Sequence, residues 1–115
     1  MEKILYTTTA VNEDGLTGVA YTKGNGDKDF SVTTSSPRSA EAGTNPEQLF
    51  ALAYATCLNA SIEFVEKRKK LEHKSKVEVK IDLTFDREGE GYLFHPSVRV
   101  IKRSYSSSSG TFNSR

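Results

Sequence analysis

A long apolar helix in the middle of the chain constrains the fold more than any other feature. Asn45 is a typical N-cap residue, Pro46 suits the first helical position, and Gln48 completes a capping box with Asn45. Glu47 adds a negative charge at the positive end of the helix dipole. We predict a helix from Pro46 to about Lys70, where consecutive basic residues suit the negative end of that dipole.

The first half of this helix, residues 49–60, carries apolar or small side chains on nearly every side. A helix with no polar face is stable in water only when most of its surface is covered. We therefore expect it to be buried, either in the core of its own chain or against a second subunit.

Strand patterns lie on both sides of the predicted helix. Residues 3–33 indicate a three-stranded meander beginning near Ile4, with turns at residues 14–15 and 24–27. Apolar and polar residues then alternate from Val77 to Phe85, and residues 92–101 return as a partner strand. These patterns predict an α+β fold, in which one antiparallel sheet, with strands from both ends of the chain, is wrapped around the long central helix.

The composition excludes several classes of function. Sixteen basic and fifteen acidic residues give a net charge of +1, which provides no electrostatic reason to expect a nucleic-acid or membrane partner. We find no run of about 18 apolar residues and no secretory signal at the N-terminus. A single cysteine excludes an internal disulfide and fits a reducing cytoplasm. His73 and His95 are interpreted as structural residues, so no metal or cofactor is expected.

The last residues differ from the rest in composition. Six serines follow Arg103, without any hydrophobic period. We therefore predict one domain over residues 1–102 and a Ser-rich disordered tail over residues 103–115.

Cys57 is the residue most able to carry out a chemical reaction, although its position alone does not make it reactive. It lies about three turns from the start of the predicted helix, beyond the reach of the dipole that lowers a thiol pKa. A cysteine among alanines is most often an inert core residue. A reactive thiolate would need a cation from elsewhere in the fold.

A local motif indicates the family. The segment from Gly43 to Phe50, followed by Ala-Tyr-Ala-Thr-Cys at residues 53–57, resembles the organic hydroperoxide resistance and osmotically inducible protein C (Ohr/OsmC) family. The resemblance covers about residues 1–102. It implies an OsmC-like fold and an intertwined homodimer. It also implies a peroxidase that reduces organic or lipid hydroperoxides to alcohols in oxidative-stress defence, with an external dithiol such as a lipoyl group as reductant.

The same resemblance implies roles for three residues. Cys57 matches the peroxidatic nucleophile, and Glu47 matches a glutamate that holds an activating arginine. The Ohr branch carries this arginine in the first hairpin turn, where this chain has Leu16, whereas the OsmC branch takes it from the loop before the helix. Arg38 lies in that loop and is our candidate. The family also has a second, resolving cysteine further on, which this sequence lacks, so the domain is interpreted as incomplete at its C-terminal end.

The missing thiol leaves two alternatives open. The chain could be a non-catalytic module that binds apolar ligands or senses redox state, or an inactive member of the family. A sulfenic acid without a resolving thiol must be reduced by an outside thiol or become irreversibly oxidised.

Helix geometry supports the homodimer that the resemblance implies. Ten residues separate Glu47 from Cys57, which places them about 15 Å apart along the axis and about 80° apart around it. One helix therefore cannot join them in one site, but two antiparallel helices can. Small residues would allow the close approach: Ala51, Ala53, Ala55 and Ala60. The alternative is that these alanines pack under the chain's own sheet.

Overall fold

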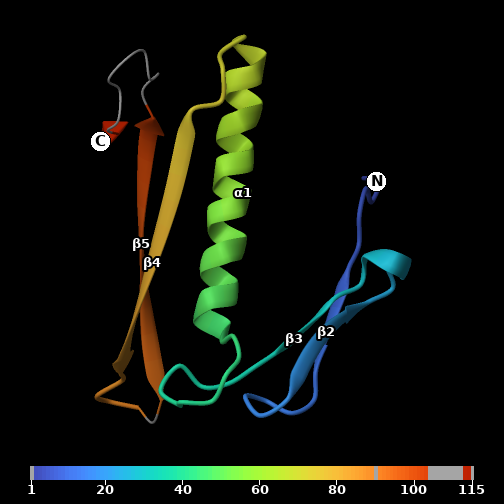
Figure 1. The fold of residues 1–115 in the computed structure, drawn as a ribbon, viewed down its shortest axis with the longest axis vertical. Coiled ribbons are helices and arrows are strands. Elements are labelled where there is room, and N and C mark those ends of the chain that lie inside the picture. Colours follow the sequence, from blue (N-terminus) through green and yellow to red (C-terminus); the bar gives the residue numbers. More distant parts are fainter. Residues whose placement is uncertain (1, 90, 104–112, 115) are drawn as a thin grey trace. The chain divides into compact units, whose positions relative to one another are not determined.

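The computed structural model describes residues 2–89, 91–103 and 113–114. The chain divides into two compact units, Met1–Pro46 and Glu47–Arg115, whose elements are shown in Figure 1.

The first unit is an antiparallel meander, as the sequence predicts. Strands β1 (Thr9–Asn12), β2 (Val19–Lys23) and β3 (Ser31–Thr33) pair in that order. The first hairpin is closed by the Asn12 side chain, which accepts from the amide of Gly15 at 2.7 Å and donates to its carbonyl at 3.0 Å. The second hairpin contains a short 3-10 helix, η1 (Gly26–Lys28).

The first strand begins later than predicted. We expected it from Ile4, but β1 starts at Thr9, and Ile4, Leu5 and Tyr6 are exposed. The reason lies in the partner strand, because Thr9 pairs with Lys23, the last residue of β2. Residues before Thr9 have no strand opposite them in the described part of this unit.

Helix α1 (Pro46–Arg68) begins at the predicted residue and ends two residues before the predicted Lys70. Lys70 adopts a left-handed conformation with φ of 60°. The amide of Leu71 then donates to the carbonyl of Glu66 at 2.8 Å, a bond that caps the last turn. The chain therefore turns out of the helix inside the run of basic residues.

Two long strands follow and form an antiparallel hairpin beside α1 (Figure 1). Strand β4 (Ser75–Phe85) pairs with β5 (Tyr92–Arg103), with Val79 opposite Val98, and the short β6 (Asn113–Ser114) pairs with the end of β5. One face of the hairpin is apolar throughout, as expected from the alternation in β4. The ring of Phe50 on α1 lies against that of Phe94 on β5, with centroids 5.4 Å apart.

The prediction of one sheet built from both ends of the chain is wrong. The described strands form two separate three-stranded sheets, β1-β2-β3 and β4-β5-β6. Each strand pairs with its neighbour in sequence, because hairpin pairing needs only short loop closures. We predicted a disordered tail over residues 103–115. In the structure Arg103 ends β5 and Asn113–Ser114 forms β6, so these residues are in strands. Residues 104–112 and 115 lie outside the described residues.

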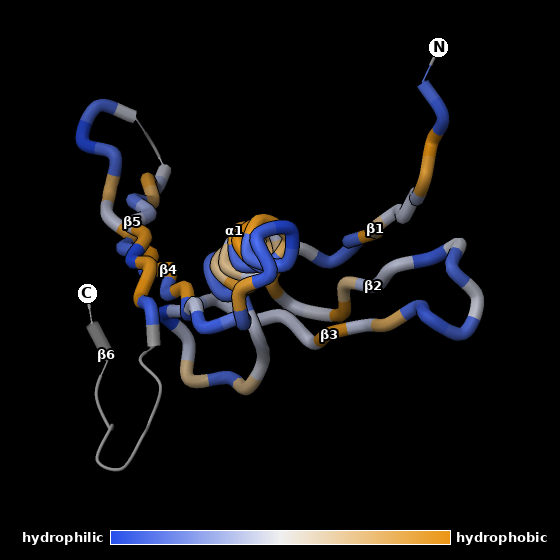
Figure 2. The backbone as a smooth tube through the Cα atoms, turned by 90° about the horizontal axis from the view of Figure 1, so that it is seen from above, coloured by the Kyte–Doolittle hydropathy of each residue, from blue (hydrophilic) through white to orange (hydrophobic). Residues whose placement is uncertain are grey.

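We expected α1 to be buried either in the core of its own chain or against a second subunit, and the first of these alternatives is wrong. None of its residues is buried, and Leu52 and Phe64 are 64% and 60% exposed. Among the described residues, Ile101 is the buried hydrophobic side chain, at 1% exposure. Figure 2 shows hydrophobic segments along α1, β4 and β5. By length and composition α1 is long and apolar enough to cross a membrane, a property that core helices of soluble proteins share.

Candidate functional site

Cys57 lies in the middle of α1 and its side chain is exposed. Helical spacing of four and three residues places it on one side of α1 together with three aromatic rings and a serine. We call this set the aromatic stripe: Phe50, Tyr54, Cys57, Ser61 and Phe64. The rings of Phe50 and Tyr54 are 5.9 Å apart, and all three rings are at least two-fifths exposed. The thiol is therefore accessible on a surface that favours an apolar organic molecule.

Glu47 lies in the first turn of α1 and is half-buried. Its Oε1 atom is buried and accepts no hydrogen bond from any described residue. An unpaired buried carboxylate oxygen is costly, so this atom marks a place where a donor is expected to bind. Because Glu47 and Cys57 are ten residues apart on one continuous helix, α1 does not itself bring them together.

Arg38 lies at the tip of a tight turn in the first unit. The amide of Ser39 donates to the carbonyl of Ser36 at 3.0 Å, and the amide of Arg38 donates to Ser36 Oγ at 3.2 Å. Pro37 occupies the turn position that its fixed φ favours. Arg38 belongs to the first unit and Cys57 to the second, so their pairing remains a prediction.

A hollow of about 480 Å³ in the first unit is lined by residues of the β1–β2 turn and of the loop that carries Arg38. Leu16 lines it from the β1–β2 turn, and Ser36 and Ser39 line it from either side of Arg38. These are the two places from which the family resemblance draws an activating arginine. Leu16 itself lines the hollow, whereas Arg38 does not and is represented there by its neighbours Ser36 and Ser39.

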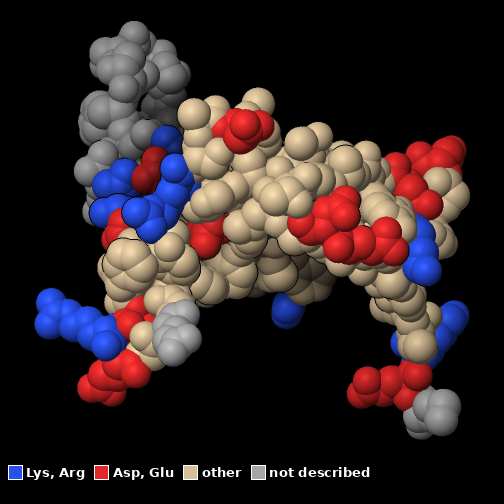
Figure 3. All heavy atoms as spheres, turned by 90° about the horizontal axis from the view of Figure 1, so that it is seen from below, with Lys and Arg blue, Asp and Glu red and all other residues tan. Residues whose placement is uncertain are grey.

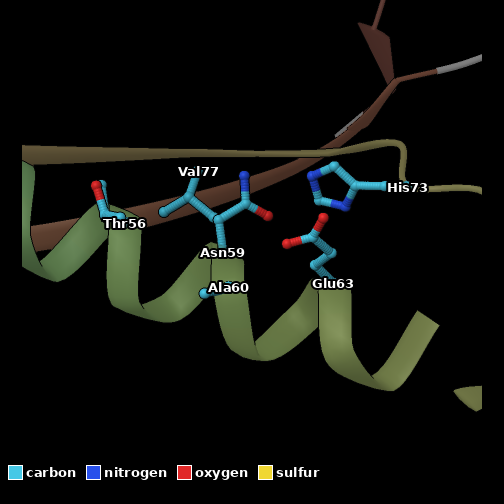
Figure 4. A pocket seen from close by; sticks show the side chains of 7 residues that line it. Thr56, Asn59, Ala60, Glu63, His73 and Val77 are labelled. Carbon is cyan, nitrogen blue, oxygen red and sulfur yellow. The ribbon is translucent and has the colours of Figure 1, made fainter. Parts of the chain in front are cut away.

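A second, smaller groove lies between α1 and β4 in the second unit (Figure 4). Thr56, Asn59, Glu63 and His73 are among the residues that line its volume of about 380 Å³. The Asn59 amide nitrogen donates to the Ser75 carbonyl at 3.1 Å, whereas Asn59 Oδ1 is buried without a partner in the described chain. Cys57 does not line this groove.

Glu66 holds the end of α1 to the start of β4. Its Oε1 atom is 2.6 Å from His73 Nδ1, and its Oε2 atom accepts from the hydroxyl of Ser75 at 3.0 Å. The hydrogen bond with His73 is the main cause that lowers the pKa of Glu66 below its ordinary value of 4.5, and burial opposes this shift. His73, interpreted from the sequence as structural, thus has a structural partner.

This cluster predicts an acid-sensitive junction between α1 and β4. A carboxyl group with a lowered pKa stabilises the fold above its unfolded pKa, and this contribution is lost as the pH falls through its folded pKa. The stability difference between the natural chain and Glu66→Gln should therefore shrink as the pH drops below 4.5. Urea unfolding at several pH values measures it. Glu63→Gln, one turn earlier, is the control, because it removes a carboxylate from the same helix and leaves the bond between Glu66 and His73 in place.

Charge and metal-binding groups give no further site in the described chain. Acidic and basic side chains lie beside one another in several groups on the face drawn in Figure 3, and broad uncharged areas lie between these groups. No group of three or more histidine, cysteine, aspartate or glutamate side chains could hold a metal ion among the residues described.

The fold and site together define a class of protein: an α+β chain with one exposed cysteine on a long helix, preceded by an acidic first helical turn. Comparison with known families agrees, since residues 38–110 match the family model described as OsmC-like protein. The chain belongs to the Ohr/OsmC family.

Individual relatives support this assignment. The chain is 38% identical over 97 residues to organic hydroperoxide resistance protein-like 1 of Staphylococcus saprophyticus, covering 83% of this chain and 64% of that protein. It is 33% identical over 89 residues to organic hydroperoxide resistance protein OhrB of Bacillus subtilis, covering 76% of this chain and 65% of OhrB. The chain thus spans just under two thirds of the length of these relatives.

Solved structures are similar as well. A candidate redox protein from Lactobacillus casei superposes with a TM-score of 0.76 at 42% identity, covering 88% of this chain and 67% of that one. The crystal structure of OhrB gives a TM-score of 0.68 at 31% identity, covering 84% and 72%. Both mixed helix-and-sheet neighbours confirm the α+β class and the family that the motif indicates.

Proposed function

We propose that this chain acts as a thiol-dependent peroxidase that reduces organic hydroperoxides to alcohols, as part of cytoplasmic defence against oxidative stress. The observation that carries the proposal is the position of Cys57, an exposed thiol on the aromatic stripe of α1. The relatives named for organic hydroperoxide resistance support the same role.

The chemistry is a two-electron displacement at oxygen. The Cys57 thiolate attacks one peroxide oxygen, the O–O bond breaks, and the alkoxide leaves and takes up a proton to become the alcohol. The sulfur is oxidised to a sulfenic acid. An external dithiol then reduces it, forming a disulfide on the reductant and releasing water. The aromatic stripe would favour substrates with an apolar body over hydrogen peroxide.

Glu47 and Arg38 complete the proposed site. A guanidinium near the thiol favours the thiolate and stabilises negative charge on the departing oxygen. The buried, unpartnered Oε1 atom of Glu47 is suited to hold such a group by a charge-assisted hydrogen bond. The ten-residue separation on α1 favours a site whose residues come from both chains of a homodimer.

A peroxide assay tests the proposed activity. The full chain is incubated with cumene or tert-butyl hydroperoxide and dihydrolipoamide, and alcohol and oxidised lipoamide are measured. Catalytic turnover with one alcohol formed per disulfide supports the peroxidase. Oxidation of Cys57 without turnover would favour the redox-sensing alternative, which the single cysteine of this sequence supports. No oxidation would indicate an inactive member or a module that binds apolar ligands.

Removing the proposed cation should make the Cys57 thiol less reactive. We expect Arg38→Ala to slow alkylation of Cys57 about tenfold near neutral pH, since a nearby guanidinium favours the reactive thiolate. The rate of Cys57 alkylation measures this effect. Arg87→Ala, an exposed arginine in the β4–β5 turn, is the control. An unchanged alkylation rate in Arg38→Ala would mean that the cation comes from elsewhere.

A further inference from the structure

We propose that a basic surface at one end of the second unit docks the chain on membranes that contain anionic lipids. The surface combines the last turn of α1, the connector of residues 69–74 and the end of β5. This inference goes beyond the proposed function and does not depend on it, because docking needs neither Cys57 nor a peroxide.

The charge of the chain is unevenly distributed, although its sum is close to zero. Residues 67–76 contain six basic residues and one acidic residue, Glu72, which gives this segment a charge of +5. The rest of the chain contains ten basic and fourteen acidic residues, a charge of −4, and the two parts together give the net charge of +1. The net charge from which we expected no membrane partner therefore hides a strongly basic segment.

The fold brings a further lysine to this segment. The end of α1, the start of β4 and the end of β5 lie at the same end of the second unit (Figure 1). Ser75, the first residue of β4, pairs with Lys102 of β5. Lys76 forms an ion pair with Glu78 at 3.3 Å and is therefore set apart. We call the remaining set the basic end: residues 67–70, Lys74 and Lys102, of which only Lys74 is half-buried and the others are exposed.

Much of this positive charge has no counter-charge in the described chain. Lys67, Lys69 and Lys70 form no ion pair with any described residue. The guanidinium of Arg68 lies over the ring of Phe64, 5.7 Å from its centroid. These four charges are therefore exposed to an anion that approaches from outside.

The acidic residues nearest to the basic end reduce its charge only in part. Glu66 is turned into the junction of α1 and β4, where two hydrogen bonds hold it and its side chain is 14% exposed. Glu72 Oε1 is 3.9 Å from Lys74 Nζ, and the Glu72 side chain is 61% exposed. An exposed pair at this distance is weak. Glu72 thus opposes an approaching anion without blocking the surface.

An exposed leucine favours a membrane over other anions. Leu71 is 58% exposed and lies in the connector between Lys70 and Lys74. The left-handed Lys70 and the bond from the Leu71 amide to the Glu66 carbonyl fix the backbone at this point. Apolar contact and attraction to anionic head groups are the two terms that bind proteins to membrane surfaces. Nucleic acids are bound best by arginine and by stacking aromatic rings, whereas five of the six residues of the basic end are lysines.

Vesicle binding tests the proposal. The full chain is mixed with vesicles of phosphatidylglycerol and phosphatidylcholine in equal parts, and the bound protein is measured by co-sedimentation. We expect binding that weakens as salt is added and that is absent with phosphatidylcholine alone. The double variant Lys69→Gln and Lys70→Gln should lower the partition coefficient by about tenfold or more. The matched control, Lys80→Gln with Arg87→Gln, removes the same charge from exposed positions further along the hairpin and should bind like the natural chain.

Two single variants separate the apolar from the electrostatic contribution. Leu71→Ala should weaken vesicle binding about tenfold and leave its salt dependence unchanged. Glu72→Gln should strengthen binding, because it removes the opposing charge. All these changes are at exposed or half-buried side chains, and circular dichroism confirms that each variant is folded.

Two results would overturn the proposal. The first is no binding to the anionic vesicles at low salt, or equal loss of binding in the hairpin control. The second is duplex DNA bound more tightly than the vesicles while Leu71→Ala leaves vesicle binding unchanged, which would assign the basic end to nucleic acid. Vesicle binding needs no peroxide turnover, so failure of the peroxidase assay and failure of this inference are distinguishable.

Discussion

Replacing Cys57 by serine is expected to abolish peroxide reduction, with a loss of at least about a thousandfold in rate. A serine hydroxyl is almost wholly protonated near neutral pH, whereas the thiolate is the species that attacks the peroxide oxygen. Because Cys57 is exposed in the single chain and serine is close to it in size, the chain should keep its fold. The measurements are alcohol formation from cumene hydroperoxide and the far-UV spectrum of the variant.

A labelling experiment gives this prediction its control. After brief exposure to an organic hydroperoxide, a sulfenic-acid reagent should modify the natural chain at Cys57 and leave Cys57→Ser unlabelled. Ser61→Ala, on the same aromatic stripe, should label at the natural rate. Labelling of Cys57 that is no faster than that of glutathione would contradict the catalytic role and would leave Cys57 as an ordinary surface thiol.

The sequence predicted the start of α1 to the residue, because the signals there are local and reinforce one another. Asn45, Pro46 and Glu47 each favour a helix start for a separate physical reason. Its end was predicted less well, since the basic residues suit the last turn but do not specify where the chain leaves it. The left-handed Lys70 and the bond from Leu71 to Glu66 decide that point.

The residues of the candidate site also differ in whether the sequence could identify them. Cys57 and Glu47 could be named from a motif, because their spacing lies within one helix. Thr34 and Ser35, which line the hollow of the first unit, and the Glu66–His73 pair could not, since burial and partners distant in sequence distinguish them. Serine and threonine in a polar loop are typical of exposed turns, so the burial of Thr34 and Ser35 could not be predicted from composition.

The alanines of α1 do not all lie in the same surroundings. We grouped Ala51, Ala53, Ala55 and Ala60 as one surface for a second copy. In the structure Ala51 and Ala55 line a groove with Val79 of β4, so these two lie against the chain's own sheet. Ala53 and Ala60 are exposed, and they flank Cys57 along the helix. We therefore choose this second pair to test the predicted interface.

We expect the chain to be a homodimer in solution, with the Cys57 side of α1 at the interface. Apolar side chains are exposed on α1 and also on β5, where Phe94, Val98 and Val100 are each at least two-fifths exposed. A surface of this kind is typical of an interaction site in a soluble protein. A two-fold pair would cover it with the same surface of the second copy, and it would let Glu47 of one chain approach Cys57 of the other.

Ala53→Glu should convert this dimer to a monomer at tens of micromolar. The carboxylate would be buried near the two-fold axis in both chains, and an unpaired buried charge costs about 3–5 kcal/mol, which corresponds to more than a hundredfold in the dissociation constant. Sedimentation velocity measures the change. Ala40→Glu, at an exposed loop position, adds the same charge and should remain dimeric. A natural chain that is monomeric at this concentration, with Cys57 still reactive toward peroxide, would contradict the shared site, because Glu47 and Cys57 are too far apart on one helix to act together.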